Sequence, residues 1–513
     1  MSYKKTILTG TLLLTISGFL SRILGFYNRI FLADLIGARE LGIYSLIFPI
    51  YALCFTLICH GSETGVSNMT SRYLSCKQEK NAIKLLRYVS IIMVSFSLFL
   101  ALLLYVSSGF ICRYLLKNAS CAKALQISSL ALPFAALKSC IHGYYLGSGK
   151  SSVAAASQLI EQISRVGGIC FLSVTLFTRH ADASLAIWGM VIGEGLSCIY
   201  SILACLFTAG RNKIRRRSFS GRGRIIEKKE NIIPAKTMLN EFFTFSIPLT
   251  INHFSLTLVS SLEAVLIPLV LTGFYGSQDL ALESYGTLTG MAFPFLFFPA
   301  TITNSLSVML LPAISASYKQ KKMVQIRYTI SKSLHYCIVL GIFSSFVFLF
   351  YGNMLGEVIF HSRTAGQYIY TFAAICPFMY AASTIMSMLN GFGYTRKTMY
   401  HSLLCVTVRI ACIFLFIPSA GIKGYLYGMI AGFILQLLLD LFSLLQITFF
   451  DFSVEKTLLF PTALSLSAGW LSQYACRYLS QATSWPPLLN MGISGLGYSL
   501  VFALAILFIS VKA

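Results

Sequence analysis

Long apolar runs separated by short polar segments recur along all 513 residues of the chain. Each run is long enough to cross a hydrocarbon layer about 30 Å thick as a helix that rises about 1.5 Å per residue. The strict alternation typical of membrane barrels is missing. The pattern predicts an all-α integral membrane protein with about fourteen transmembrane helices. We place them near residues 6–30, 41–66, 88–110, 122–147, 152–177, 183–208, 240–272, 283–312, 328–351, 365–391, 397–417, 424–448, 456–476 and 488–510.

The sequence resembles itself across its two halves. Two stretches repeat: "WGMVIG" from Trp188 returns as "YGMIAG" from Tyr427, and five positions of restrictive type recur 244 residues later. These five pairs are Pro133/Pro377, Phe134/Phe378, Gly147/Gly391, Gly149/Gly393 and Arg165/Arg409. With six helices per half, the repeats are parallel and enter the membrane from the same side.

This repeat predicts the domain organisation. We expect an N-terminal six-helix bundle at 1–210, a basic cytoplasmic linker at 211–238, a C-terminal six-helix bundle at 239–450 and two appended helices at 451–513. Two such halves are typical of V-shaped transporters that hold their substrate between the bundles and work by alternating access.

Composition and charge support a membrane location. The chain is 56% hydrophobic and 11% charged, and its mean hydropathy of +0.74 excludes a soluble globular protein. Of the 40 basic residues, 27 lie in segments that are cytoplasmic if the N-terminus is, and eight lie in the opposite loops. The positive-inside rule therefore predicts a multi-pass membrane protein with both termini cytoplasmic. It also removes nucleic acid as a partner of the basic run 211–224, which we expect to touch anionic lipid headgroups.

Five basic residues remain inside the predicted spans, where charge is costly unless it faces protein or water. They are Arg22, Arg29, Lys138, Arg165 and Arg409. Arg22 and Arg29 lie two turns apart on one helix face, although Arg29 is also near enough to the helix end to reach the outer headgroups. Guanidinium groups suit phosphate oxygens, so these arginines are candidates for binding a diphosphate headgroup.

Acidic residues inside the spans point to charge pairing or to a coupling cation. Glu161 and Arg165 are spaced i and i+4 and can pair, which would equally explain them as a structural ion pair. Glu263 is flanked by apolar residues and needs a partner, a proton or a bound cation, and Lys138 is a further candidate for pairing. Sodium or a proton are the coupling ions that we consider.

Motifs of bond-breaking chemistry are missing from the sequence. There is no P-loop, no H-E-x-x-H, no G-x-S-x-G and no Cys/His metal spacing. We therefore expect neither catalytic residues, nor a bound metal, nor a cofactor.

Two stretches carry a resemblance to a known group. "SRILGFYNRIFLADLIGARELGIYSLIFPIY" from Ser21 and "QLIEQISRVGG" from Gln158 resemble the stage V sporulation protein B group, the MurJ-like polysaccharide biosynthesis proteins. That group belongs to the multidrug/oligosaccharidyl-lipid/polysaccharide flippase superfamily. The resemblance implies a fourteen-helix flippase, not an enzyme. It would move an undecaprenyl-diphosphate-linked sugar, foremost lipid II, to the outer leaflet for cell-wall or spore-cortex peptidoglycan.

The resemblance also implies which residues meet the headgroup. Arg22 and, with a shift of one residue, Arg29 match the basic residues that line the central cavity in MurJ-like proteins. The arginines that such proteins carry in helices 2 and 8 are missing here, so Arg165 and Arg409 are expected to replace them. Three alternatives stay open: a flippase for another undecaprenyl-linked polysaccharide, a multidrug/cation antiporter of the same fold, and a non-transporting scaffold for cell-wall polymerases.

Overall fold

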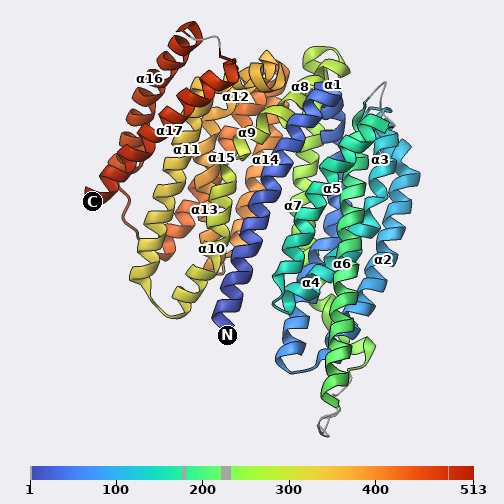
Figure 1. Ribbon diagram of the computed structural model, residues 1–513. Helices are drawn as coiled ribbons and strands as arrows, with labels where there is room; N and C mark the ends of the chain where they lie inside the picture. Colours follow the sequence, from blue (N-terminus) through green and yellow to red (C-terminus); the bar gives the residue numbers. More distant parts are fainter. Residues whose placement is uncertain (1–2, 176–180, 221–232, 483–484, 513) are drawn as a thin grey trace. The chain divides into compact units, whose positions relative to one another are not determined.

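The computed structural model describes residues 3–175, 181–220, 233–482 and 485–512, and within these ranges every regular element is a helix (Figure 1). The long α-helices are α1 (Tyr3–Ser75), α2 (Glu79–Phe110), α4 (Ala131–Gly147), α5 (Ser151–Thr175), α6 (Ala183–Ser220), α7 (Ala235–Tyr275), α10 (Ala300–Lys319), α11 (Met323–Phe360), α13 (Cys376–Gly391), α14 (Thr395–Ala420), α15 (Ile422–Ile447), α16 (Phe460–Ala482) and α17 (Pro487–Lys512). The shorter elements are η1 (Ile111–Leu115), α3 (Cys121–Ser129), α8 (Gln278–Gly286), η2 (Thr287–Ala292), α9 (Phe293–Phe297), α12 (Arg363–Phe372), η3 (Ala373–Ile375) and η4 (Glu455–Leu459).

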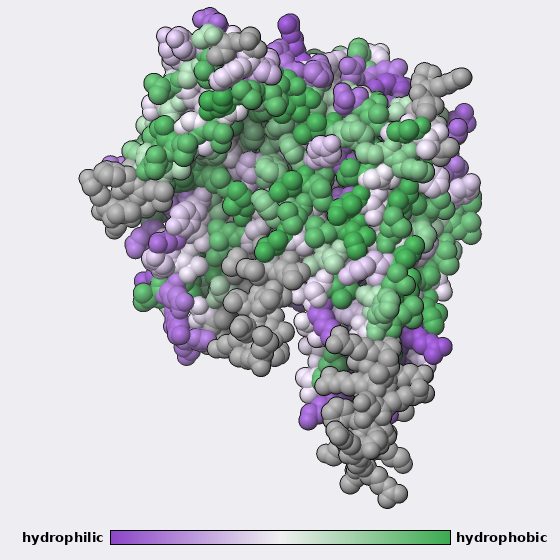
Figure 2. Space-filling view, in the orientation of Figure 1, coloured by the Kyte–Doolittle hydropathy of each residue, from purple (hydrophilic) through white to green (hydrophobic). Residues whose placement is uncertain are grey.

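The fourteen predicted spans fall in helices wherever the structure describes them, so the predicted fold class is confirmed. Ten described helices are long and apolar enough to cross a membrane, or eleven if the bent pair 278–297 and 300–307 forms one span. Two facts account for the difference from fourteen. Helix α1 covers the first two predicted spans, and α5 and α16, which correspond to two further predicted spans, are not among the ten. Hydrophobic side chains cover the flanks of the helices, and hydrophilic ones gather towards the helix ends (Figure 2).

The join between the first two predicted spans is a single residue. Gly37 has φ 75° and ψ 173° inside an otherwise helical α1. Only glycine adopts this backbone conformation at little cost. The predicted spans 6–30 and 41–66 leave residues 31–40 as a connection between them. In the structure this connection is helical, apart from the kink at Gly37.

The chain forms two compact units. Unit 1 comprises the described residues of Met1–Asn28 and Ile43–Val265, and unit 2 comprises those of Arg29–Gly42 and Leu266–Ala513. Helices α1 and α7 thus contribute to both units. The domain boundaries expected from the repeat stay predictions. Helix α6 runs through the first part of the predicted basic linker to Ser220, and residues 221–232 of that linker lie outside the described residues.

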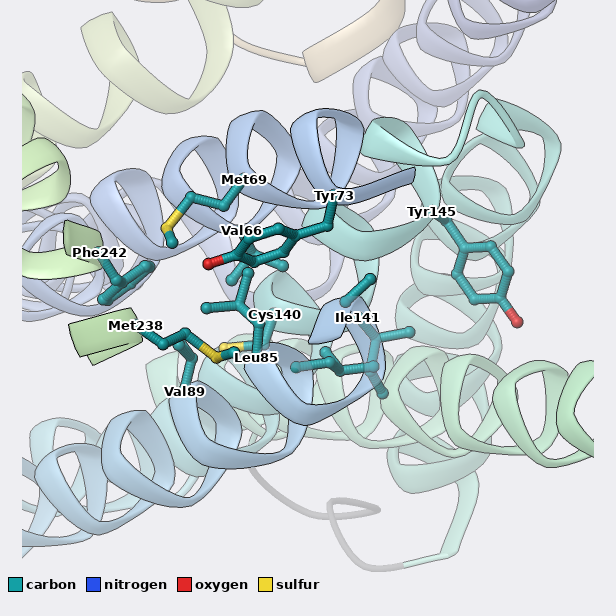
Figure 3. Packing of buried hydrophobic residues seen from close by; sticks show 12 residues of the cluster. Val66, Met69, Tyr73, Leu85, Val89, Cys140, Ile141, Tyr145, Met238 and Phe242 are labelled. Carbon is teal, nitrogen blue, oxygen red and sulfur yellow. The ribbon is translucent and has the colours of Figure 1, made fainter. Parts of the chain in front are cut away.

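A buried apolar cluster holds α4 in unit 1. It brings together side chains from α1, α2, α4 and α7 (Figure 3). These include Val66, Met69, Tyr73, Leu85, Val89, Cys140, Ile141, Tyr145, Met238 and Phe242. Unit 2 has a corresponding cluster built from α10, α11, α13 and α15, which includes Leu310, Ile314, Ile330, Leu334, Ile385, Met388, Leu389 and Leu444. Each cluster fixes the helices that carry polar residues deeper in the unit.

Close helix contacts repeat between the units at the expected offsets. A Cβ atom on Gly193 of α6 would lie 2.8 Å from the Glu161 carbonyl oxygen, and one on Gly432 of α15 would lie 3.5 Å from the Cys405 carbonyl oxygen. Both glycines also face the side chain of the arginine one turn further along the neighbouring helix. The helix pair α5 and α6 therefore packs like the pair α14 and α15, as the internal repeat predicts.

Candidate functional site

Four charged side chains meet inside unit 1. The Lys138 ammonium of α4 lies 2.8 Å from Glu161 Oε2 of α5 and 2.5 Å from Glu194 Oε2 of α6. Arg165, one turn along α5, lies 2.7 Å from the other Glu161 oxygen. The side chains of Lys138, Glu161 and Glu194 are only 8%, 15% and 6% exposed. These four residues form what we call the charge cluster.

The charge cluster balances its own charges. Two cations face two carboxylates, and Lys138 bridges both carboxylates, so the ionised cluster carries no net charge. Burying isolated charges costs several kcal/mol each, a cost that is offset only by close partners and good hydrogen bonds. Glu161 and Glu194 are thus already neutralised from within the chain.

Two polar groups beside the charge cluster stay without a partner among the described residues. They are Arg165 Nε and the Tyr51 hydroxyl of α1, both buried. Buried polar groups of this kind are normally satisfied by protein, water or ligand. The edge of the charge cluster that faces α1 is therefore the place where unit 1 can accept a further polar group.

The structure bears on the predicted roles of these residues in part. In the structure Glu161 pairs with Arg165, and Lys138 pairs with Glu161 and Glu194. The roles of these residues in headgroup binding and in coupling stay predictions. Glu194 is a further carboxylate within the predicted span 183–208. Its partner lies on another helix, which spacing along one helix cannot show.

Arg22 and Arg29 share a face of α1 but belong to different units. Arg22 is exposed in unit 1, and Gly25 on the same face lies beside α5, where an added Cβ would be 3.7 Å from Gln162 Oε1. Arg29 is half-buried in unit 2 and donates a hydrogen bond of 2.8 Å to the carbonyl oxygen of Thr289. Thr289 belongs to the π-helix η2, a local widening that often marks functional sites. Headgroup binding by either arginine stays a prediction.

The other predicted site residues lie apart from the charge cluster. Arg409 on α14 is half-buried, with its guanidinium 5.7 Å from the centre of the Phe433 ring. Glu263 on α7 is buried at 5% exposure and interacts with a neighbouring group. Their roles in headgroup binding and in coupling stay predictions. Among the described residues, no group of three or more His, Cys, Asp or Glu side chains could hold a metal ion.

Sequence reasoning missed a second buried polar group, in unit 2. His401 of α14 lies 2.7 Å from Asp440 of α15, and Gln436 donates to the other oxygen of that carboxylate. Asp440 lies within the predicted span 424–448 and His401 within the predicted span 397–417, but no contact between them was predicted. The signal was available in the repeat, because both residues occupy the positions of polar residues in the first half.

Comparison with known proteins identifies the family of the chain. The family described as polysaccharide biosynthesis protein matches residues 7–318. The chain belongs to this family. It is 25% identical over 487 residues to stage V sporulation protein B of Bacillus subtilis, covering 94% of this chain and 91% of that protein.

Two further relatives refine the placement within the family. The lipid II flippase MurJ of Bacillus subtilis is 22% identical over 327 residues, which cover 61% of this chain and 58% of MurJ. A solved structure of lipid II flippase MurJ in an inward closed conformation has the same fold, with a TM-score of 0.71, 19% identity and coverage of 98% of this chain and all of that one. The expected membership in the group of stage V sporulation protein B and MurJ is therefore confirmed.

Proposed function

We propose that the chain is a flippase for a lipid-linked oligosaccharide, and that its substrate is lipid II. The observation that carries the proposal is the extent of the family relationship, which reaches 94% of the chain for stage V sporulation protein B. The MurJ fold over 98% of the chain is consistent with the same activity.

The charges of unit 1 favour an anionic substrate over a cationic one. A cation antiporter needs carboxylates that can meet its substrate, but Glu161 and Glu194 are tied to Lys138 and Arg165. Arg22 is exposed on the face of α1 that approaches α5. Its guanidinium can offer a planar pair of donors to the oxygens of a diphosphate.

In this proposal the substrate keeps its lipid tail in the hydrocarbon while the headgroup crosses within the protein. Arginines replace water around the diphosphate, with Arg22 as the first contact and Arg29, Arg165 and Arg409 as further contacts. The two repeats alternate between inward-open and outward-open states. The protein resides in a bacterial plasma membrane with both termini cytoplasmic, and cell-wall polymerases are the partners that would use the product.

The test is movement of a fluorescent lipid II analogue across the bilayer of liposomes that contain the purified protein. We expect Arg22→Ala to slow movement by about tenfold or more, because one charge-assisted hydrogen bond is worth roughly 1.5–3 kcal/mol. Arg87→Ala is the matched control, since Arg87 is an exposed arginine at the start of α2, and its rate should equal that of the unsubstituted protein.

Each outcome of this experiment separates the alternatives. No movement by the unsubstituted protein, with movement of another undecaprenyl-linked sugar, would assign a different polysaccharide. A scaffold would be favoured if the protein moves neither the lipid II analogue nor another undecaprenyl-linked sugar, and if the Arg22→Ala variant restores cell-wall synthesis in cells that lack the protein. Accumulation of an organic cation in the liposomes would favour an antiporter and contradict the proposal.

A further inference from the structure

A histidine and a buried aspartate form a close pair in unit 2. His401 Nδ1 of α14 lies 2.7 Å from Asp440 Oδ1 of α15. Gln436, one turn before Asp440, donates from Nε2 to Asp440 Oδ2 at 2.8 Å. Asp440 is fully buried, whereas the His401 side chain is 17% exposed. The carboxylate is thus held from two sides, and the imidazole links it to the surface of the unit.

The pair can hold one exchangeable proton. With the proton, it is either an imidazolium facing a carboxylate or a neutral imidazole facing a carboxylic acid, and both arrangements carry no net charge. Without the proton, a neutral imidazole donates to a carboxylate, and the pair carries one negative charge. Histidine is the side chain whose ordinary titration falls between about pH 5 and 8. The loss or gain of this proton therefore changes the buried charge of unit 2 by one.

Charged side chains lie on both sides of the pair along α14. The exposed Arg396 and Lys397 lie about one turn before His401, and Arg409 lies two turns after it. Ser402 accepts from Gln436 and donates to Met386 of α13.

The other elements packed against α15 bring little charge to this level. The titratable groups of α13 are Cys376 and Tyr380, and the Tyr380 hydroxyl donates to the Leu296 carbonyl. Helix α12 meets the opposite end of α15, where Phe372 packs on Tyr425. Its charged and titratable residues, Arg363, Tyr368 and Tyr370, belong to that end.

The corresponding place in unit 1 has serines instead of the pair. The offsets of the repeat map His401 onto Ser157, Gln436 onto Ser197 and Asp440 onto Ser201. In unit 1 these serines hydrogen-bond one another, with Ser157 Oγ 2.7 Å from Ser197 Oγ and 3.0 Å from Ser201 Oγ. The Nε2 atom of His142 on α4 lies 3.5 Å from Ser201 Oγ. The same backbone framework therefore carries three hydroxyls beside a histidine in unit 1 and a histidine–carboxylate pair in unit 2.

We propose that the His401–Asp440 pair is a proton-binding site that couples proton binding in unit 2 to transport. The proposal rests on the proposed function only in naming the transported substrate, the lipid-linked oligosaccharide. Protonation removes the buried charge of unit 2, and deprotonation restores it. Because the two conformations of a carrier expose unit 2 differently, they differ in proton affinity, and pH biases the equilibrium between them.

The first experiment measures movement of the fluorescent lipid II analogue in proteoliposomes at about pH 6, 7 and 8. The unsubstituted protein should change its rate by about fivefold or more across this range, and His401→Gln should change by less than about twofold. Gln keeps a hydrogen-bond donor towards Asp440 but cannot bind the proton. Ser157→Ala is the matched control at the same position of the other repeat, and it should keep the pH dependence. An equal pH dependence in His401→Gln and the unsubstituted protein would overturn the proposal.

The second experiment needs no transport and uses purified full-length protein in detergent. Thermal unfolding is measured over the same pH range for the unsubstituted protein, His401→Gln and Asp440→Asn. Since deprotonation leaves a buried carboxylate uncompensated, the unfolding temperature of the unsubstituted protein should fall as pH rises, by roughly 2–4 °C more than that of either variant. Parallel curves for all three proteins would refute the proton site. If the analogue does not move but the curves diverge, the proposed substrate fails while the proton site stands.

Discussion

The two repeats pack their helices alike but place buried polar residues at different levels. At the level of the repeated contact between α6 and α5 in unit 1, and between α15 and α14 in unit 2, both repeats carry an arginine, but only the first carries carboxylates and a lysine. The residues there are Lys138, Glu161 and Glu194 in the first repeat and Ala382, Cys405 and Phe433 in the second. One to two turns away, the first repeat has Ser157, Ser197 and Ser201. The second repeat has His401, Gln436 and Asp440 at the equivalent positions.

This difference shows that one set of residues determines how the helices pack and another set determines which polar groups are buried. Small residues at close crossings, such as Gly193 and Gly432, fix the distance between the helices in both units. The polar side chains then fill the space that this packing leaves. The charge cluster of unit 1 joins two cations to two carboxylates, whereas the buried pair in unit 2 joins a histidine to one carboxylate. The two units therefore bury different polar groups on the same helix framework.

The largest expected effect comes from breaking the charge cluster. Lys138→Met keeps the length of the side chain but leaves Glu161 and Glu194 facing each other without their shared cation. Removing one partner of a buried ion pair costs about 3–5 kcal/mol. We expect a lower unfolding temperature in detergent and less folded protein in the membrane.

A rescue sharpens this prediction. The double variant Lys138→Met and Glu194→Gln removes one cation and one carboxylate and leaves the pair of Glu161 and Arg165 in place. It should recover most of the lost stability, because no buried charge is then left without a partner. Ala382→Met, at the position equivalent to Lys138 in unit 2, controls for the bulk of the methionine. A double variant no more stable than Lys138→Met would show that the charges themselves hold the unit together.

A middle-sized effect is expected at the serine cluster of unit 1. Ser157→Ala removes the hydroxyl that links Ser197 and Ser201, but each of these still donates to a backbone carbonyl. The loss should therefore be close to that of one hydrogen bond, about 1 kcal/mol, as read from the unfolding temperature. Ser173→Ala on the exposed part of α5 is the control, because its hydroxyl bonds only to its own helix. A loss as large as that of Lys138→Met would mean that the two levels of unit 1 are not distinct.

The sequence was sufficient for the helices and for the repeat, because apolar length and the spacing of Gly, Pro and Arg are local properties. It also predicted the pair of Glu161 and Arg165, whose spacing along one helix fixes their contact. It could not predict Glu194 or His401 as partners, since each meets a charge from another helix. It could not show that Arg22 and Arg29, two turns apart on α1, belong to different units and have different surroundings, because the part of α1 that belongs to unit 2 begins at Arg29.

The smallest expected effect distinguishes the two equivalent arginines. Arg165 lies against a carboxylate, whereas Arg409 lies over the Phe433 ring. Phe433→Leu removes the ring, and a cation–π contact of this kind is worth about 0.5–2 kcal/mol. We expect a slightly lower unfolding temperature for Phe433→Leu, and no such change for Phe414→Leu, an exposed ring on α14. If Phe433→Leu instead lowers stability as much as Glu161→Gln, the ring supports Arg409 as firmly as the carboxylate supports Arg165, and the two arginines are held equally by different means.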